Sequence, residues 1–402
     1  GFSERVTLLK ASIFEKQEKY SEARQEVEKV MDLFPEALQF RIVAAELSMK
    51  EGEEERAADF YKEILEIDST NIFAITNLTD YYRKKEQIGK SLQYLTRSFY
   101  SEQIEVDRKL AIMSFYLSDD EIITANSEEL HHLISAFREK HPDHREGMVM
   151  AANFYIQIRE FERAYTELRA LLDTGETNYS AYMQAVMLAN AAGRNEDLIE
   201  VSSRGIELYP DSTDLRFFRA IGYYESEQYN QIIDNFKGTD LEGYRNREYA
   251  TQSKIILAEA LYRLDQFNQS DSIFEQLIRD QPDNYIVLNN YSYYLAERGE
   301  RLESARKWSK IAVKNNPENA IFLDTYAWVL YRLGEYEKAE VIILQALEKG
   351  GENDPEINEH AGDIQRAMNS NDIARSYYEN ALILGGERER LEKKIKKIES
   401  VR

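Results

Sequence analysis

The chain has 402 residues, of which 43% are hydrophobic, 31% are charged and only 6 are proline. This apolar content suits a large ordered structure and disfavours disorder. The formal net charge of −22 repels a phosphate backbone over most of the surface, so no nucleic-acid partner is expected. Because cysteine is absent, disulfides, thiolate metal sites and a cysteine nucleophile are excluded.

No run of about 18 apolar residues occurs, so we expect no transmembrane segment in this chain. The sequence begins GFSERV, without a methionine. This start is compatible with the removal of a signal or lipid-attachment segment, and it leaves the compartment open.

Along the chain, a small residue recurs with a bulky residue four positions later, as in Ala57/Tyr61 and Ser270/Phe274. This spacing places both side chains on one face of a helix. Just upstream of each pair comes a turn, and before the turn an apolar helix. The second-helix markers recur mostly about 34 residues apart, at Ala23, Ala57, Ser91, Ala164, Leu198, Ile232, Ser270, Ala305, Ala339 and Ala374.

This period predicts about eleven helical hairpins. The final segment, from Glu387 onward, carries Leu391, Ile395 and Ile398 on one face and charges elsewhere, which predicts a capping helix. The first helices are predicted to begin near Ser3, Ala37, Ile72, Glu105, Arg145, Tyr179, Thr213, Thr251, Tyr285, Ala320 and Pro355.

Two stretches depart from the period. Residues 106–142 are weakly patterned and contain the long connection SDDEIITANSEE, at 118–129. Residues 237–249 form a polar loop in place of the usual proline corner. Either segment could be a hinge, near 119–127 or 237–249, which gives blocks of 1–105, 106–242 and 243–402. The alternative is one continuous solenoid with tolerated insertions.

The pattern resembles the tetratricopeptide consensus over nearly the whole chain. One unit carries the pair Leu257-Ala258 with Leu261, Phe274 and Pro282, and a later unit carries Ala327 in the equivalent pattern. The resemblance implies an all-α, right-handed superhelical solenoid. In such folds each unit exposes an apolar face that its neighbour covers, and the concave wall binds partners.

No catalytic chemistry is expected. P-loop, GxSxG and HExxH motifs are absent, so we predict no enzyme activity and no cofactor. Four of the five histidines cluster at His131, His132, His141 and His144, while His360 lies far away. Because adjacent His131 and His132 point to different helix faces, no metal site is predicted.

If the family geometry holds, particular positions of the first helices line the concave groove. In the last four units this gives carboxylates beside aromatic side chains, a surface that could clamp a basic or mixed-charge peptide. The alternative is that the aromatics fill a tightly wound groove and the carboxylates only solvate it. The candidate residues are Tyr262, Asn289, Tyr293, Asp324, Trp328, Tyr331, Arg332, Glu359, Asp363 and Arg366.

Some members of the family grip acidic chaperone tails with lysine, arginine and asparagine at these inner positions. Here only Asn153 and Asn289 are of the right type, while Asp324 and Glu359 would repel a carboxylate. We therefore expect a basic or mixed-charge partner rather than an acidic one.

Residues 289–384 look like the C-terminal repeats of bacterial cell-envelope tetratricopeptide proteins, and the extra residue in the turn ERGERLE adds to the likeness. The resemblance suggests a periplasmic or lipid-anchored scaffold that binds a protein or peptide and assembles an envelope complex. Two alternatives stay open: a self-assembly module that forms homo-oligomers, and a binder of glycans or small ligands. The sequence leaves the oligomeric state undetermined.

Overall fold

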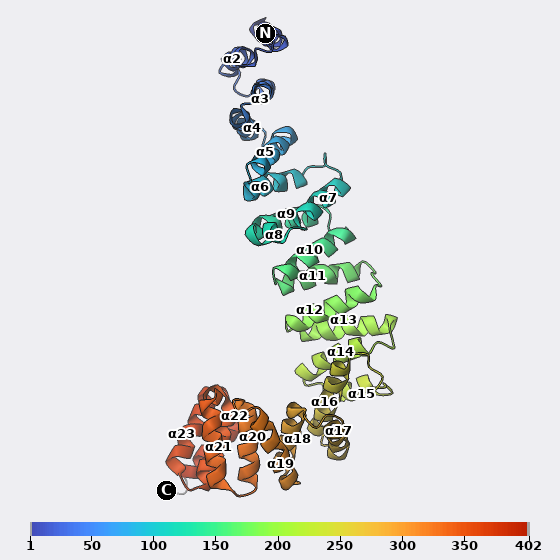
Figure 1. Cartoon of the computed structure of the whole chain (residues 1–402), viewed down its shortest axis with the longest axis vertical. Coiled ribbons are helices and arrows are strands. Elements are labelled where there is room, and N and C mark those ends of the chain that lie inside the picture. Colours follow the sequence, from blue (N-terminus) through green and yellow to red (C-terminus); the bar gives the residue numbers. More distant parts are fainter. Residues whose placement is uncertain (1, 400–402) are drawn as a thin grey trace. The chain divides into compact units, whose positions relative to one another are not determined.

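The computed structural model describes residues 2–399, and over that range the chain forms 24 α-helices and one short 3₁₀ helix. It divides into two compact units, Gly1–Arg194 and Asn195–Arg402. Within each unit, consecutive helices pack in chain order as antiparallel hairpins, except within residues 106–142 (Figure 1). The predicted all-helical, tetratricopeptide-like solenoid is confirmed, with about twelve hairpins. The three-block division of the sequence stays a prediction.

The helices of the first unit are α1 (Phe2–Lys16), α2 (Tyr20–Met31), α3 (Leu38–Glu51), α4 (Glu54–Ile67), α5 (Ile72–Lys84), α6 (Ile88–Phe99), α7 (Val106–Tyr116), α8 (Asp120–Ala125), α9 (Ser127–Lys140), α10 (Arg145–Gln157), α11 (Phe161–Asp173) and α12 (Tyr179–Ala191). Those of the second unit are α13 (Asn195–Leu208), α14 (Thr213–Glu225), α15 (Tyr229–Phe236), α16 (Arg247–Arg263), α17 (Phe267–Asp280), α18 (Tyr285–Arg298), α19 (Leu302–Asn315), α20 (Ala320–Arg332), α21 (Tyr336–Glu348), η1 (Gly351–Asn353), α22 (Pro355–Ala367), α23 (Asn371–Ile383) and α24 (Arg388–Glu399).

Side-chain caps explain where the first helices begin. Seven of them start at the residue that the sequence predicts, and in each the preceding side chain accepts a hydrogen bond from the first turn. One prediction is four residues late: α16 begins at Arg247 rather than Thr251, because Asn246 caps it through Glu248 and Tyr249. The seven capping residues are Asn71, His144, Asn178, Ser212, Asn284, Asn319 and Asp354.

The turn that follows each regular first helix contains a residue in the left-handed conformation, and the turn after Arg298 contains a second, Arg301. This conformation ends the helix and lets the chain reverse, and glycine adopts it at the lowest cost. Apart from Arg301, only four of the ten such positions are glycine, which is why glycine alone does not mark the repeat. The ten are Glu18, Gly52, Glu86, Arg159, Gly193, Glu227, Asp265, Gly299, Gly334 and Asn369.

The ten second-helix markers that define the period all lie in the core. Each is at most 1% exposed, from Ala23 to Ala374. Their large neighbours are buried too: Phe274 and Tyr378 are fully enclosed and Tyr61 nearly so. The sequence period is therefore a packing period, set by small residues where neighbouring helices approach closely.

The first irregular stretch contains α8, an extra helix within the connection that the sequence analysis marked as too long. As a result α6 packs against α9, while α7 makes only slight contact with α9 and α10. The buried Lys109 side chain ties α7 to the end of α6, because its ammonium donates to the carbonyl oxygens of Phe99 (2.7 Å) and Ser101 (3.0 Å). In the second irregular stretch, residues 237–246 carry no regular helix.

The predicted capping helix is α24. It packs on α23, with Leu391 and Ile398 buried against Ala374, Tyr378 and Ala381. This contact covers the apolar face that the last hairpin would otherwise expose.

We expect Gly362→Ala to destabilise the protein, although alanine is the better helix former. A β-carbon at this position in α22 would lie 2.4 Å from Cε1 of Tyr378, whose ring is fully buried and cannot retreat. The expected loss is about 1 to 3 kcal/mol, measured as a lower melting temperature by circular dichroism. Gly89→Ala is the control, because its β-carbon would meet only the ends of flexible side chains. An unchanged or higher melting temperature for Gly362→Ala would contradict this packing.

Candidate partner-binding groove

The ten candidate residues lie on the first helices of the last four hairpins. We call the surface formed by α16, α18, α20 and α22 the first-helix wall. Along it, α18 contacts α20 and α20 contacts α22 directly. The wall therefore brings together side chains about 35 residues apart in the sequence, as the family geometry implied.

Trp328 of α20 lies at the centre of an aromatic stack. Its ring is stacked on His360 of α22, with ring centres 4.1 Å apart, and on Tyr331, at 4.8 Å. The indole nitrogen donates to Glu297 at 2.7 Å, and Arg332 lies over the ring while donating to the backbone oxygen of Glu297. Because Trp328 is only 8% exposed, most of its surface packs against protein.

Beneath this stack, Asp324 of α20 and His360 of α22 form a buried pair. The Nδ1 atom of His360 lies 2.9 and 3.0 Å from the two carboxylate oxygens of Asp324, and each residue is 5% exposed. Burial disfavours the charged imidazole, but the charge and hydrogen bond of Asp324, with Glu356 and Asp363 nearby, raise the pKa of His360 to about 9. His360 is therefore protonated at neutral pH.

Two tyrosines connect the wall across repeats. The hydroxyl of Tyr293 on α18 donates to the exposed Glu356 of α22 at 2.5 Å, and burial together with this carboxylate raises the pKa of Tyr293. Tyr262 packs on Tyr294, with ring centres 4.1 Å apart. Both candidate tyrosines are half-buried, so part of each ring faces solvent.

Asn289 is almost fully buried on α18, and its amide donates to Asn290 at 3.3 Å. Its side-chain oxygen, Oδ1, has no hydrogen-bond partner among residues 2–399. Asn290 in turn donates to the buried Glu259 of α16 at 2.9 Å, and burial raises the pKa of that carboxyl group.

The last two candidate carboxylates form ion pairs with the C-terminal helix. Glu359 accepts from Arg390 (2.7 Å) and Lys394 (2.6 Å), and Asp363 accepts from Lys394 (2.5 Å). Tyr378 also donates to Asp363, at 2.7 Å. The carboxylates of α22 are thus neutralised by basic side chains of α24.

The burial of Asn289, Asp324, Trp328 and Glu359 favours the packing alternative for these four. Tyr262, Tyr293, Tyr331, Asp363, Arg332 and Arg366 remain part-exposed. The partner-binding role of all ten stays a prediction.

The partners of these residues were not predicted from the sequence, above all His360, which lies against Asp324, and Glu297, which accepts from Trp328. A signal was present, because the same separation of 31 residues recurs between acceptor and donor. This separation is about one helical turn shorter than the repeat. It is the distance in sequence at which residues on neighbouring first helices face each other. The pairs are Glu259–Asn290, Glu297–Trp328, Glu359–Arg390 and Asp363–Lys394.

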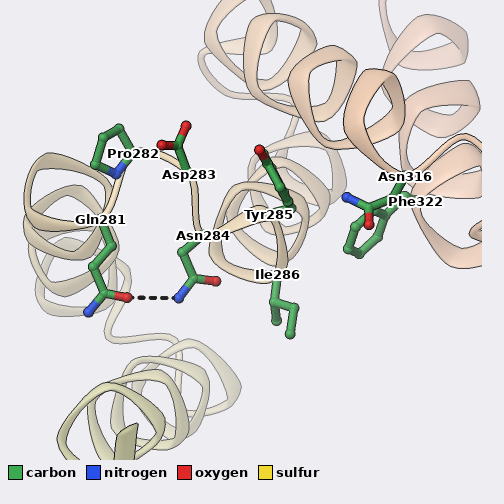
Figure 2. Close-up of a pocket in the computed structure, with 8 residues that line it drawn as sticks. All are labelled: Gln281, Pro282, Asp283, Asn284, Tyr285, Ile286, Asn316 and Phe322. Carbon is green, nitrogen blue, oxygen red and sulfur yellow. Dashed lines mark hydrogen bonds between the residues drawn. The ribbon is translucent and has the colours of Figure 1, made fainter. Parts of the chain in front are cut away.

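An open pocket of about 570 Å³ lies away from these residues, where the α17–α18 and α19–α20 corners meet. Figure 2 shows the hydrogen bond between two of its lining residues, in which Asn284 donates to Gln281 (3.0 Å). Asn284 also caps α18, so these amides shape the corner. The lining residues are Gln281, Pro282, Asp283, Asn284, Tyr285, Ile286, Asn316 and Phe322.

The clustered histidines serve packing contacts. His131 lies 2.9 Å from the hydroxyl of Tyr155, and both His141 and His144 pack against Phe137. Within residues 2–399, no group of three or more His, Cys, Asp or Glu side chains is arranged to hold a metal ion.

Comparison with known proteins agrees with this architecture. A family profile for the tetratricopeptide repeat matches residues 8–72 and 257–320. These two segments are tetratricopeptide repeats. A crystal structure of a tetratricopeptide repeat protein from Parabacteroides merdae superposes with a TM-score of 0.53 at 12% identity, covering 63% of this chain and 98% of that one. At this identity the likeness shows the fold alone.

Two longer matches have lower scores. Yeast Tom70 covers 98% of this chain and 94% of its own, at 14% identity and a TM-score of 0.44. The Cut9–Hcn1 hetero-tetramer structure of the APC/C covers 98% of this chain and 89% of its own, at 11% identity and 0.47. A search of curated proteins finds no match.

Tetratricopeptide repeat proteins typically bind other proteins and are generally non-catalytic scaffolds, which agrees with the prediction that this chain is not an enzyme. In the described part of the chain, every helix is too short or too polar to span a membrane.

Proposed function

We propose that this protein is a non-catalytic scaffold that holds a basic or mixed-charge segment of a partner protein on the first-helix wall. The candidate contacts are the part-exposed groups of that wall. These groups include Tyr293, Arg332 and Arg366, beside the exposed carboxylates of Glu297 and Glu356.

The observation that carries this proposal is the way α24 sits on α22. Arg390 and Lys394 are four residues apart on α24, and they pair with Glu359 and Asp363, which are four residues apart on α22. The chain thus uses its own basic amphipathic helix as a ligand for this type of surface. Charge-assisted hydrogen bonds at matched spacing supply both strength and register. Basic side chains of a partner segment would pair in the same way with the exposed carboxylates of Glu297 and Glu356.

The wall carries both positive and negative groups, which supports recognition of a particular charge pattern rather than attraction of any basic segment. Arg332 of α20 lies over Trp328 and donates to the backbone oxygen of Glu297 on α18, so positive and negative groups lie side by side on neighbouring first helices. Such an arrangement fixes the register of a bound segment and rejects partners of the wrong pattern. A place in the bacterial envelope, where the scaffold would assemble a complex, is part of this proposal and rests on the resemblance of residues 289–384.

Charge reversal on the wall tests the proposal. Partners captured by the full-length chain would be purified, and their affinities measured by calorimetry. We expect Glu356→Lys to weaken a basic partner at least about tenfold, because it replaces an attraction by a repulsion. Glu337→Lys, on the exposed face of α21, is the matched control and should leave affinity unchanged. Equal affinities for the two variants would rule out the first-helix wall as the docking surface.

A further inference from the structure

The irregular stretch of the first unit opens an apolar groove between α7 and α10. Its volume is about 490 Å³, within the range of roughly 300 to 1,000 Å³ that is typical of ligand sites. Apolar side chains form most of its surface: Leu110, Ala111, Val149, Met150 and Leu171. We call it the α7–α10 groove.

The groove lies where α7 is not packed against a second helix as the regular first helices are. In the second unit, α18 lies directly against α19, whereas α7 makes only slight contact with α9 and α10. Helix α7 is held from its other side, where Lys109 is tied to the end of α6 and Met113 and Tyr116 are buried. The groove is therefore built into a fixed frame, and it does not depend on a loose helix.

The apolar surface of the groove is open to solvent. Val149 is 40% exposed and Ala111 is also exposed, although both flank the buried Leu110 and Leu171. Covering these side chains would be favourable by roughly 25 cal/mol per Å² of apolar area removed from water.

Three charged residues lie at the edge of the groove, and two of them already have partners. Arg145 donates to Thr174 and lies 3.8 Å from Glu176. Glu176 accepts two backbone hydrogen bonds, at 2.9 Å each, from Asn178 and Thr177, and these lower its pKa. Glu146 has no ion pair or hydrogen-bond partner within residues 2–399. The groove thus presents one uncommitted negative charge, in a chain whose net charge is −22.

We propose that the α7–α10 groove binds a short segment of a partner protein, which inserts one or two large apolar side chains and places a lysine or arginine against Glu146. The inference rests on the proposed scaffold function and adds a second contact surface to it. Insertion of apolar side chains supplies affinity, and the cation opposite Glu146 fixes orientation. A segment of acidic character would meet repulsion at the same place.

A defined peptide tests the proposal on the full-length chain by fluorescence anisotropy. The probe is a fluorescein-labelled peptide of about 12 residues, with two leucines four positions apart and two lysines beside them. We expect Val149→Asp and Ala111→Trp each to lower its affinity at least about tenfold, by charging the groove and by filling it. Glu146→Lys should weaken this peptide and strengthen a version in which glutamates replace the lysines.

Val341→Asp on α21 is the matched control, because Val341 is also exposed, at 56%, but lies outside the groove. It should leave the affinity for the peptide unchanged. Glu356→Lys on the first-helix wall should also leave it unchanged, so failure of the groove proposal can be told apart from failure of the wall proposal. Circular dichroism would check that Val149→Asp still folds, with Ala111→Trp as the second variant. The proposal is overturned if a peptide with serines in place of the leucines binds as well, if Val149→Asp and Val341→Asp behave alike, or if Val149 mediates self-association instead.

Discussion

Asp324→Asn is expected to lower the free energy of unfolding of the second unit by about 3 kcal/mol at pH 7. Removing one partner of a buried ion pair leaves the other charge uncompensated, and such losses are typically 3 to 5 kcal/mol. Here the remaining partner is His360 of α22, which is 5% exposed and packs against Asp324 and Trp328 of α20. The asparagine keeps the shape of the side chain, so the effect reports the charge rather than a cavity.

Urea unfolding followed by tryptophan fluorescence measures this loss. The chain has only 2 tryptophans, and both Trp308 and Trp328 lie in the second unit, so the signal reports that unit. Asp283→Asn is the control, because Asp283 is exposed at the α17–α18 corner, and its urea midpoint should stay close to that of the wild type. A midpoint for Asp324→Asn equal to that of Asp283→Asn would show that the pair adds nothing to stability.

The same pair predicts that the second unit loses stability as the pH rises from about 6.5 to about 9. The pKa of His360 is about 9 in the folded chain and 6.5 ordinarily, so the folded state holds the proton more tightly. The stabilisation is complete below pH 6.5 and is lost as the pH passes through 9, and its full size is on the order of 3 kcal/mol. The groups that face the imidazole are Asp324 on α20, Glu356 and Asp363 on α22, and the rings of Trp328 and Tyr293.

Urea midpoints at pH 6.5, 8 and 9.5 would follow this loss. In Asp324→Asn the decline should be much smaller, because the carboxylate that raises the pKa is gone. A wild-type profile that is flat over this range, or that rises with pH, would refute the assignment of a charged His360.

Much of the fold could be predicted from the sequence, because the features that set it are local. A small residue every 34 or so positions marks close helix crossings, and markers such as Ala339 are fully buried. The predicted first residues of the helices were correct where an asparagine, serine, histidine or aspartate caps the helix. The prediction was wrong at α16, where the cap at Asn246 lies outside the repeat pattern. The extra helix α8 was missed, because the sequence showed only a connection that was too long.

The candidate groove could be predicted less well. Position within the repeat placed Asp324 and Trp328 on the correct helix, yet their partners lie 36 and 31 residues away. Which donor meets which carboxylate depends on the offset between neighbouring first helices, and this offset is set by packing. The α7–α10 groove was not foreseeable either, since it lies where α7 packs only slightly against α9 and is marked by no motif.

The central claim is that a partner docks on the first-helix wall. Photo-crosslinking tests it most directly: benzoylphenylalanine would replace Tyr293 on α18, which is part-exposed, and, as a comparison, Leu344 on α21, which is 46% exposed. We predict that benzoylphenylalanine at position 293 crosslinks to the partner and that the same group at position 344 does not. Adding Glu356→Lys should abolish the crosslink from position 293. Crosslinking of the same partner from position 344 alone, or equally from both positions, would contradict the central claim.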